Sequence, residues 1–94
     1  MNSNDALYGY LAGQFSDADM IGQSDEQAAV DGVSNATRAA YEDVLRQGHS
    51  VLASTPFDWQ RIGDYANRAF EDEDEARRWL KQMMDLLDEA LKAL

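Results

Sequence analysis

The chain has 94 residues, of which 18 are acidic and 8 are basic, so its net charge is −10 at pH 7. This length fits one domain over residues 1–94, and a hydrophobic content of 45% argues against wholesale disorder. The charge disfavours nucleic acid and anionic membranes as partners, because both would be repelled. No cysteine is present, which excludes disulfides and thiol chemistry. No signal peptide and no apolar run long enough to span a membrane is evident, so we expect a cytoplasmic protein.

The first predicted helix starts near Asn4 or Asp5 and shows one apolar face at near-helical spacing, made by Leu7, Tyr10, Leu11 and Phe15. Residues 16–23 are predicted to form a loop, with Met20 and Ile21 as its apolar anchor. Residues 1–37 contain six acids and no Lys or Arg, so this segment carries a large share of the net negative charge.

The second predicted helix opens with a capping-box pattern, in which the Ser24 hydroxyl accepts from a first-turn amide and Gln27 reaches back. A short apolar stripe follows, made by Ala29, Val30 and Val33. The third helix is predicted to begin around Asn35 to Thr37 and to run to about Ala53. Its buried face repeats every three or four residues, at Tyr41, Val44, Leu45, Gly48 and Leu52.

Thr55 and Pro56 then break the chain and are predicted to start a fourth helix, with Thr55 as the N-cap and Pro56 at the first helical position. This helix carries Trp59, Ile62, Ala66 and Phe70. The last helix opens in the acidic run with the charge sign that the helix dipole favours. Its apolar face extends for about 20 residues through Ala76, Trp79, Leu80, Met83, Leu87, Ala90, Leu91 and Leu94. The pattern predicts an all-α fold, a compact antiparallel bundle of four to five helices.

Motifs for catalysis and for metal binding are weak. His49 is the single histidine and has no orienting partner placed by the sequence, which favours a structural or surface role. The segment from Asp17 begins like a calcium-binding loop, but Ile21 and Ala28 occupy positions that need oxygen ligands. We therefore expect no catalytic residue, no metal and no cofactor. An enzyme that uses a metal ion and paired carboxylates is the weakest alternative.

The acidic run Glu71–Glu75 has two readings. It is either a solvated helix start or a docking site for a cationic partner. Helix-dipole gains of about 0.3–1 kcal/mol for each acid do not account for five acids in a row, which favours a docking role for the surplus. Trp59 is the candidate aromatic anchor, whereas Trp79 lies on the core stripe. The residues predicted to contact a basic partner are Asp17, Asp19, Asp25, Asp31, Trp59, Glu71, Asp72, Glu73 and Asp74.

The order of these features resembles the immunity proteins of contact-dependent growth inhibition systems. The resemblance rests on Leu7-Tyr8-Gly9-Tyr10-Leu11 with Phe15, the acidic loop that ends in Ser24-Asp25-Glu26-Gln27-Ala28, Val44-Leu45, and Ala76-Arg77-Arg78-Trp79-Leu80. It covers most of the chain outside residues 55–70. Other small helical bacteriocin immunity proteins, such as those against tRNA-cleaving colicins, are broadly similar.

The resemblance implies a function: stoichiometric 1:1 binding of the C-terminal toxin domain that a neighbouring cell delivers. Such toxins are often nucleases that cleave tRNA, and their substrate grooves are basic. An acidic immunity protein would compete with the phosphate backbone for that groove. The resemblance transfers no individual contact residues. A regulatory helical module that self-associates through apolar faces is the alternative of a different class.

Overall fold

The computed structural model describes residues 4–16 and 18–94, which form helices joined by short connections and contain no strand. The elements in chain order are α1 (Asp5–Gln14), the 3₁₀ helix η1 (Ala18–Ile21), α2 (Asp25–Val30), α3 (Arg38–Leu52), α4 (Trp59–Ala66) and α5 (Glu73–Lys92). The predicted all-α class is confirmed. No helix among the described residues is long and apolar enough to cross a lipid bilayer.

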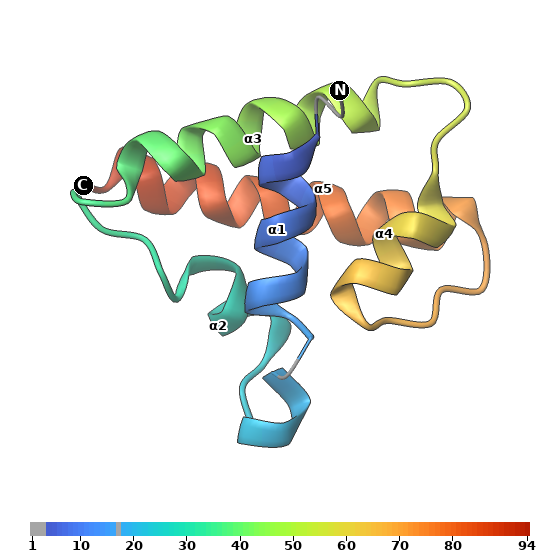
Figure 1. Ribbon diagram of the computed structural model, residues 1–94, viewed down its shortest axis with the longest axis horizontal. Helices are drawn as coiled ribbons and strands as arrows, with labels where there is room; N and C mark the ends of the chain where they lie inside the picture. Colours follow the sequence, from blue (N-terminus) through green and yellow to red (C-terminus); the bar gives the residue numbers. More distant parts are fainter. Residues whose placement is uncertain (1–3, 17) are drawn as a thin grey trace.

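Two long helices, α3 and α5, pack against each other and run in opposite directions, while α1 crosses in front of them (Figure 1). The antiparallel arrangement therefore holds for this pair, and α1 lies across it. Helix α1 packs on α3 and α4, whereas α2 and α4 pack on α5. The loop that contains η1 projects away from the helices, as Figure 1 shows below α1.

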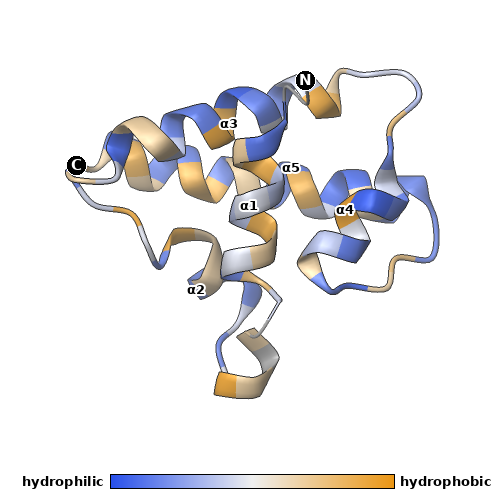
Figure 2. Ribbon diagram, viewed as in Figure 1, coloured by the Kyte–Doolittle hydropathy of each residue, from blue (hydrophilic) through white to orange (hydrophobic). Residues whose placement is uncertain are grey.

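The core is built from the buried faces of α5 and of the helices around it, α1, α3 and α4. Apolar and polar positions alternate along α3 and α5 (Figure 2), as expected for helices with one buried face. The largest fully buried side chains are Phe15, Leu7, Leu11, Ile62, Leu80, Met83, Met84 and Leu87. Half of these come from α5, so the helix with the longest apolar stripe in the sequence supplies the centre of the core.

Several predicted boundaries are confirmed. Ser24 and Gln27 form the complete capping box at the start of α2. Helix α3 ends at Leu52, within one residue of the predicted end. Asp72 is the N-cap of α5, and its carboxylate accepts a hydrogen bond of 2.9 Å from the Glu75 amide.

The prediction that Met20 and Ile21 anchor the 16–23 loop is wrong. Met20 is 85% exposed and Ile21 is 72% exposed, whereas Ala18 is buried at 2%. Ala18 donates its amide to the Phe15 carbonyl at 3.2 Å and accepts at 2.9 Å from the Gln23 amide. These bonds close the loop on itself, so the small Ala18 faces the core and the two large side chains face outward.

The predicted start of the fourth helix is also wrong. Thr55 and Pro56 lie in the connection before α4, are joined by a cis peptide bond, and are exposed. Phe57 enters the core next, and the Arg77 guanidinium lies 4.4 Å from its ring centroid. The helix begins only after this insertion, with Asp58 as its N-cap. It also ends before Phe70, because Asn67 adopts a left-handed conformation with φ of 56°.

Two glycines give a matched test of helix packing. A Cβ on Gly63 of α4 would lie 2.7 Å from the Arg68 carbonyl oxygen, whereas a Cβ on Gly9 of α1 meets no atom within 4 Å. We expect Gly63→Ala to lower the free energy of unfolding by about 1–3 kcal/mol, because the backbone at Arg68 must shift. Gly9→Ala should raise it by about 0.5–1 kcal/mol through helix propensity. Urea denaturation followed by circular dichroism measures both, and equal stability of Gly63→Ala and wild type would contradict the packing argument.

Candidate partner-binding surface

One predicted contact residue, Asp25, is used inside the protein. Its carboxylate accepts from Arg68, with 2.5 Å between Nη2 and Oδ1, and from the indole of Trp79, with 2.9 Å between Nε1 and Oδ2. Arg68 also donates to the carbonyl oxygens of Ala66 and Asn67, at 3.1 and 3.0 Å. The carboxylate therefore joins the start of α2 to the α4–α5 connection and to α5.

The surroundings of Asp25 favour its ionised form. Partial burial, the largest single influence, opposes ionisation, but the hydrogen bonds from Arg68 and Trp79 and the charge of Arg68 together outweigh it and lower the pKa of Asp25. Trp79 is held in place by its own packing, with its ring centroid 4.9 Å from that of Phe15 and 5.5 Å from that of Phe70. Trp79 was predicted to be a core residue from the apolar face of the last helix. Its ring does pack on the core, and its indole N–H donates to Asp25.

The predicted acids do not gather in one place. Asp31 is exposed at the end of α2, and Figure 1 shows this end far from the start of α5, where Glu71 to Asp74 lie. Asp17 and the side chain of Asp19 lie outside the described part of the molecule, although Asp19 itself belongs to η1. The fold therefore separates Asp31 from the acidic run.

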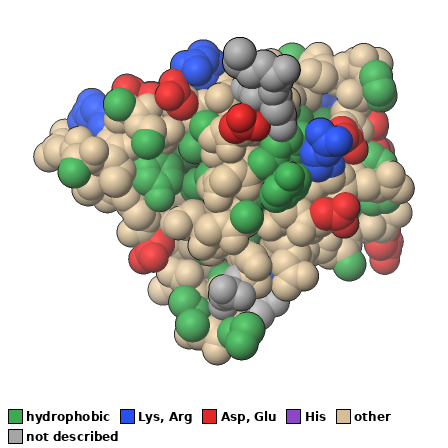
Figure 3. Space-filling model, in the orientation of Figure 1, with side chains coloured by type: hydrophobic (Ala, Val, Ile, Leu, Met, Phe, Trp, Pro, Cys, Tyr) green, Lys and Arg blue, Asp and Glu red, His purple; other side chains and the backbone are tan. Residues whose placement is uncertain are grey.

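Trp59 lies in a hollow whose lining ends at Phe70, the residue directly before the acidic run. A hollow of about 170 Å³ lies between α4 and the chain that follows it, lined by Trp59, Gln60, Gly63, Asp64, Arg68, Ala69 and Phe70. Trp59 is half-buried in it, and Phe70 directly precedes Glu71. We call Asp64, Glu71, Asp72, Glu73 and Asp74 the acidic corner. Acidic side chains lie on this side of the molecule in Figure 3, over α4 and the start of α5.

The acids of the corner have different roles. Asp72 caps α5, and Glu73 forms an ion pair of 3.7 Å with Arg77 one turn later. Glu71 and Asp74 are exposed and form no ion pair among the described residues. Four neighbouring acids that look equivalent in the sequence are thus one cap, one ion-pair member and two side chains that are available to a partner.

Asp64 was missed by the sequence analysis. It belongs to the polar side of α4, one turn after Gln60, and lines the same hollow as Trp59. The predicted fourth helix already contained Asp64, and helical spacing places it one turn after Gln60, but nothing in the sequence shows that this side of the helix borders a hollow.

The basic residues are mostly neutralised within the molecule. Of the 8 Lys and Arg residues, six form ion pairs within 4 Å with the chain's own acids: Arg46, Arg61, Arg68, Arg77, Lys81 and Lys92. Most of these pairs are exposed and contribute little to stability. They do, however, reduce the positive potential at the surface, so the field around the molecule is set by the surplus acids.

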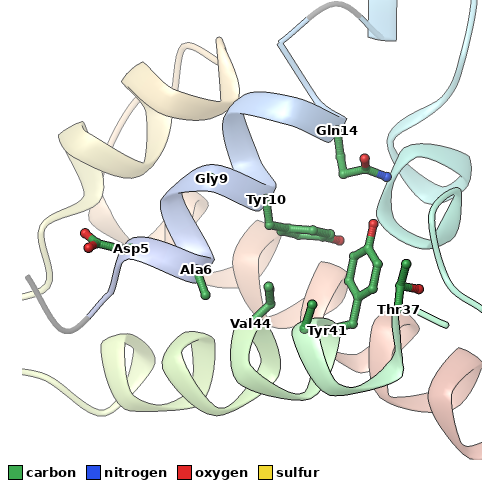
Figure 4. Close-up of a pocket in the computed structure, with 9 residues that line it drawn as sticks. Asp5, Ala6, Gly9, Tyr10, Gln14, Thr37, Tyr41 and Val44 are labelled. Atoms are coloured by element: carbon green, nitrogen blue, oxygen red, sulfur yellow. The ribbon is translucent and has the colours of Figure 1, made fainter. Parts of the chain in front are cut away.

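A second hollow lies between α1 and α3 and has a volume of about 400 Å³ (Figure 4). Tyr10 and Tyr41 meet edge to face there, with ring centroids 5.8 Å apart. The Tyr10 hydroxyl donates to the Ala29 carbonyl at 2.7 Å, and the Gln14 amide donates to the Ala28 carbonyl at 2.9 Å. Burial raises the pKa of both tyrosines. These polar groups hold α2 in place, which gives this end of the groove a structural role.

Other groups that could carry chemistry are dispersed. His49 is exposed on α3 and lines a separate hollow with Arg77 and Lys81. Within residues 4–16 and 18–94, no group of three or more His, Asp or Glu side chains is close enough together to hold a metal ion. Comparison of the chain with protein-family models, with curated proteins and with solved structures gave no match.

The Asp25 interaction predicts a pH dependence of stability. Because its pKa is lower in the folded protein, the unfolded chain binds more protons, and this contribution to stability is complete above the pKa of an unfolded Asp, about 3.9. It is lost as the pH falls through the folded pKa. Asp25→Asn should therefore destabilise the protein at neutral pH by about 1–3 kcal/mol and flatten the loss of stability in acid.

Thermal unfolding between neutral and acidic pH measures this difference. Asp43→Asn is the matched control, because Asp43 is an exposed carboxylate paired with Arg46 on α3. An acid profile of Asp25→Asn as steep as that of wild type would show that the carboxylate does not stabilise the fold through Arg68 and Trp79.

Proposed function

We propose that this chain is an immunity protein that binds the C-terminal nuclease toxin domain of a contact-dependent growth inhibition system and masks its basic substrate site. The toxin is expected to be a tRNA-cleaving nuclease, and the complex to contain one copy of each chain. The observation that carries the proposal is the charge arrangement. Six of the eight basic residues are paired internally, and Glu71 and Asp74 remain exposed in the acidic run that follows Phe70, a residue lining the same hollow as Trp59.

A nuclease groove is suited to such a surface because it presents Lys and Arg side chains to phosphates. Carboxylates at the acidic corner would pair with those side chains and speed the encounter of the two proteins. Trp59 would supply the aromatic contact, since half-buried tryptophans beside a hollow are typical of residues that dominate binding energy. The same argument applies to a colicin-type immunity protein, which differs in how its toxin is delivered.

A self-associating helical module is the second candidate. The exposed side chains of Met20 and Ile21 favour it, because apolar side chains on a projecting loop are available to another copy. It predicts a stable homodimer of the isolated chain with little sensitivity to salt. Light scattering of the purified protein separates the two, since the immunity function predicts a monomer that becomes a 1:1 complex.

The direct test uses the C-terminal domain of the protein encoded immediately upstream of this chain. The two should form a 1:1 complex, and the purified chain should abolish cleavage of tRNA by that domain. If the domain neither binds the chain nor is inhibited by it, the proposed function is wrong.

Charge reversal at Glu71 and Asp74 tests the surface. Both side chains are exposed and unpaired, so Glu71→Lys with Asp74→Lys leaves the Asp72 cap and the Glu73–Arg77 pair intact. We expect the association rate with the upstream domain to fall at least about 10-fold at low ionic strength, and its salt dependence to weaken.

The matched control reverses two exposed acids elsewhere, Glu42 on α3 and Glu89 near the end of α5. Glu42→Lys with Glu89→Lys changes the net charge by the same amount, so a larger effect at the corner identifies the position rather than the total charge. Stopped-flow measurement at low and high salt gives the rates. Equal rates for the two double variants would exclude the acidic corner as the interface.

A further inference from the structure

The loop between α1 and α2 ends in an exposed apolar pair. Met20 and Ile21, which we call the apolar tip, are 85% and 72% exposed and are the most exposed large hydrophobic side chains in the described part of the chain. The loop that contains them ends in a hydrophobic stretch in Figure 2, and Figure 3 shows hydrophobic side chains at the end of the same loop. The apolar tip is thus the pair of neighbouring large hydrophobic side chains that the described part of the fold exposes most fully to solvent.

The loop is held in a defined shape. Its backbone is closed by the 2.9 Å bond from the Gln23 amide to the Ala18 carbonyl, and Gly22 adopts a φ of +71° that suits glycine. Ala18 fixes the turn to the core by its burial. The apolar tip is therefore presented on an ordered turn, which reduces the entropy lost when a partner binds it.

Both ends of the loop are also tied to the segment that leads into the acidic corner. The Asn67 side-chain amide donates to the Ser16 carbonyl at 3.2 Å, and Arg68 binds the carboxylate of Asp25 at 2.5 Å. Residues 67 and 68 thus hold the two ends of the loop, and the acidic corner resumes three residues later at Glu71. Figure 1 shows the loop projecting below α1 and α5 beginning at the right of the molecule, so the apolar tip and the acidic corner are two separate points of contact that share one supporting segment.

We propose that the apolar tip inserts into an apolar pocket of the basic partner protein, at a second point of contact from the Lys and Arg side chains that the acidic corner meets. This inference rests on the proposed function and deepens it by naming the contact that supplies affinity. The charges supply the rate of encounter, and the apolar tip slows dissociation, because burial of large side chains at the centre of an interface dominates binding energy.

The charge of the chain argues for a basic protein over other occupants of the apolar tip. A second copy carries the same net charge of −10 and would be repelled. Two side chains are also far less than the roughly 800 Å² that each partner contributes to a stable dimer, so a symmetric contact through the tip alone is too small. An anionic lipid surface would repel the chain as well. A basic partner protein that also has an apolar pocket satisfies both features.

The test compares Met20→Ser with Ile21→Ser, made together, against wild type in binding to the C-terminal domain encoded upstream. We expect the Kd to rise about 30-fold or more, mainly through faster dissociation, with the salt dependence of binding unchanged. Unfolding temperature should stay the same because both side chains are exposed. Leu94→Ser is the matched control, since Leu94 is 41% exposed at the end of the chain, and its Kd should change less than about 3-fold.

The outcomes separate this inference from the function on which it rests. Wild-type binding with an unchanged Kd for the tip variant overturns the inference and leaves the immunity function standing. Absence of wild-type binding overturns both. A wild-type dimer that the tip variant dissolves would identify a second copy as the occupant, which also overturns the inference.

Discussion

Asp25 accepts hydrogen bonds from Arg68 and from the indole of Trp79, and through these bonds one carboxylate positions α2, the α4–α5 connection and α5. Helix α2 has only six residues and is too short to be stable alone, so it depends on such tertiary contacts. The hydroxyl of Tyr10 holds its other end through the Ala29 carbonyl. A few polar bonds at the edge of the apolar core therefore fix the position of α2 against α1, α5 and the α4–α5 connection.

The same interaction explains how an acidic chain keeps an acidic surface. Arg68 is largely buried and is paired with Asp25, and most other basic side chains pair with an acid one turn away on the same helix. Little positive charge therefore remains to offset Glu71 and Asp74. Pairing within helices is a local property of the sequence. The acids that are left without an ion-pair partner produce the long-range negative field that a cationic partner would meet.

Much of the fold could be predicted because it follows from local signals. Periodic apolar positions marked α1, α3 and α5, and the Ser24 capping box marked α2. The misassigned parts depend on distant contacts. The sequence predicts that Met20 and Ile21 anchor their loop, but Ala18 is the residue of this loop that is buried. The sequence also predicts that Asp25 is a surface acid, but Arg68 and Trp79, more than 40 residues away in the chain, bind it. Periodicity carries no information about such pairs.

The bonds from Asn67 to Ser16 and from Arg68 to Asp25 hold the two ends of the loop between α1 and α2. The segment between them is attached at both ends, and Ala18 of η1 is buried in the core. Substitutions or insertions at the outer positions of this segment would leave the helices undisturbed, since lengthening a surface loop whose ends are fixed costs little. The outer positions of this segment can therefore change in sequence while the packing of the helices stays the same.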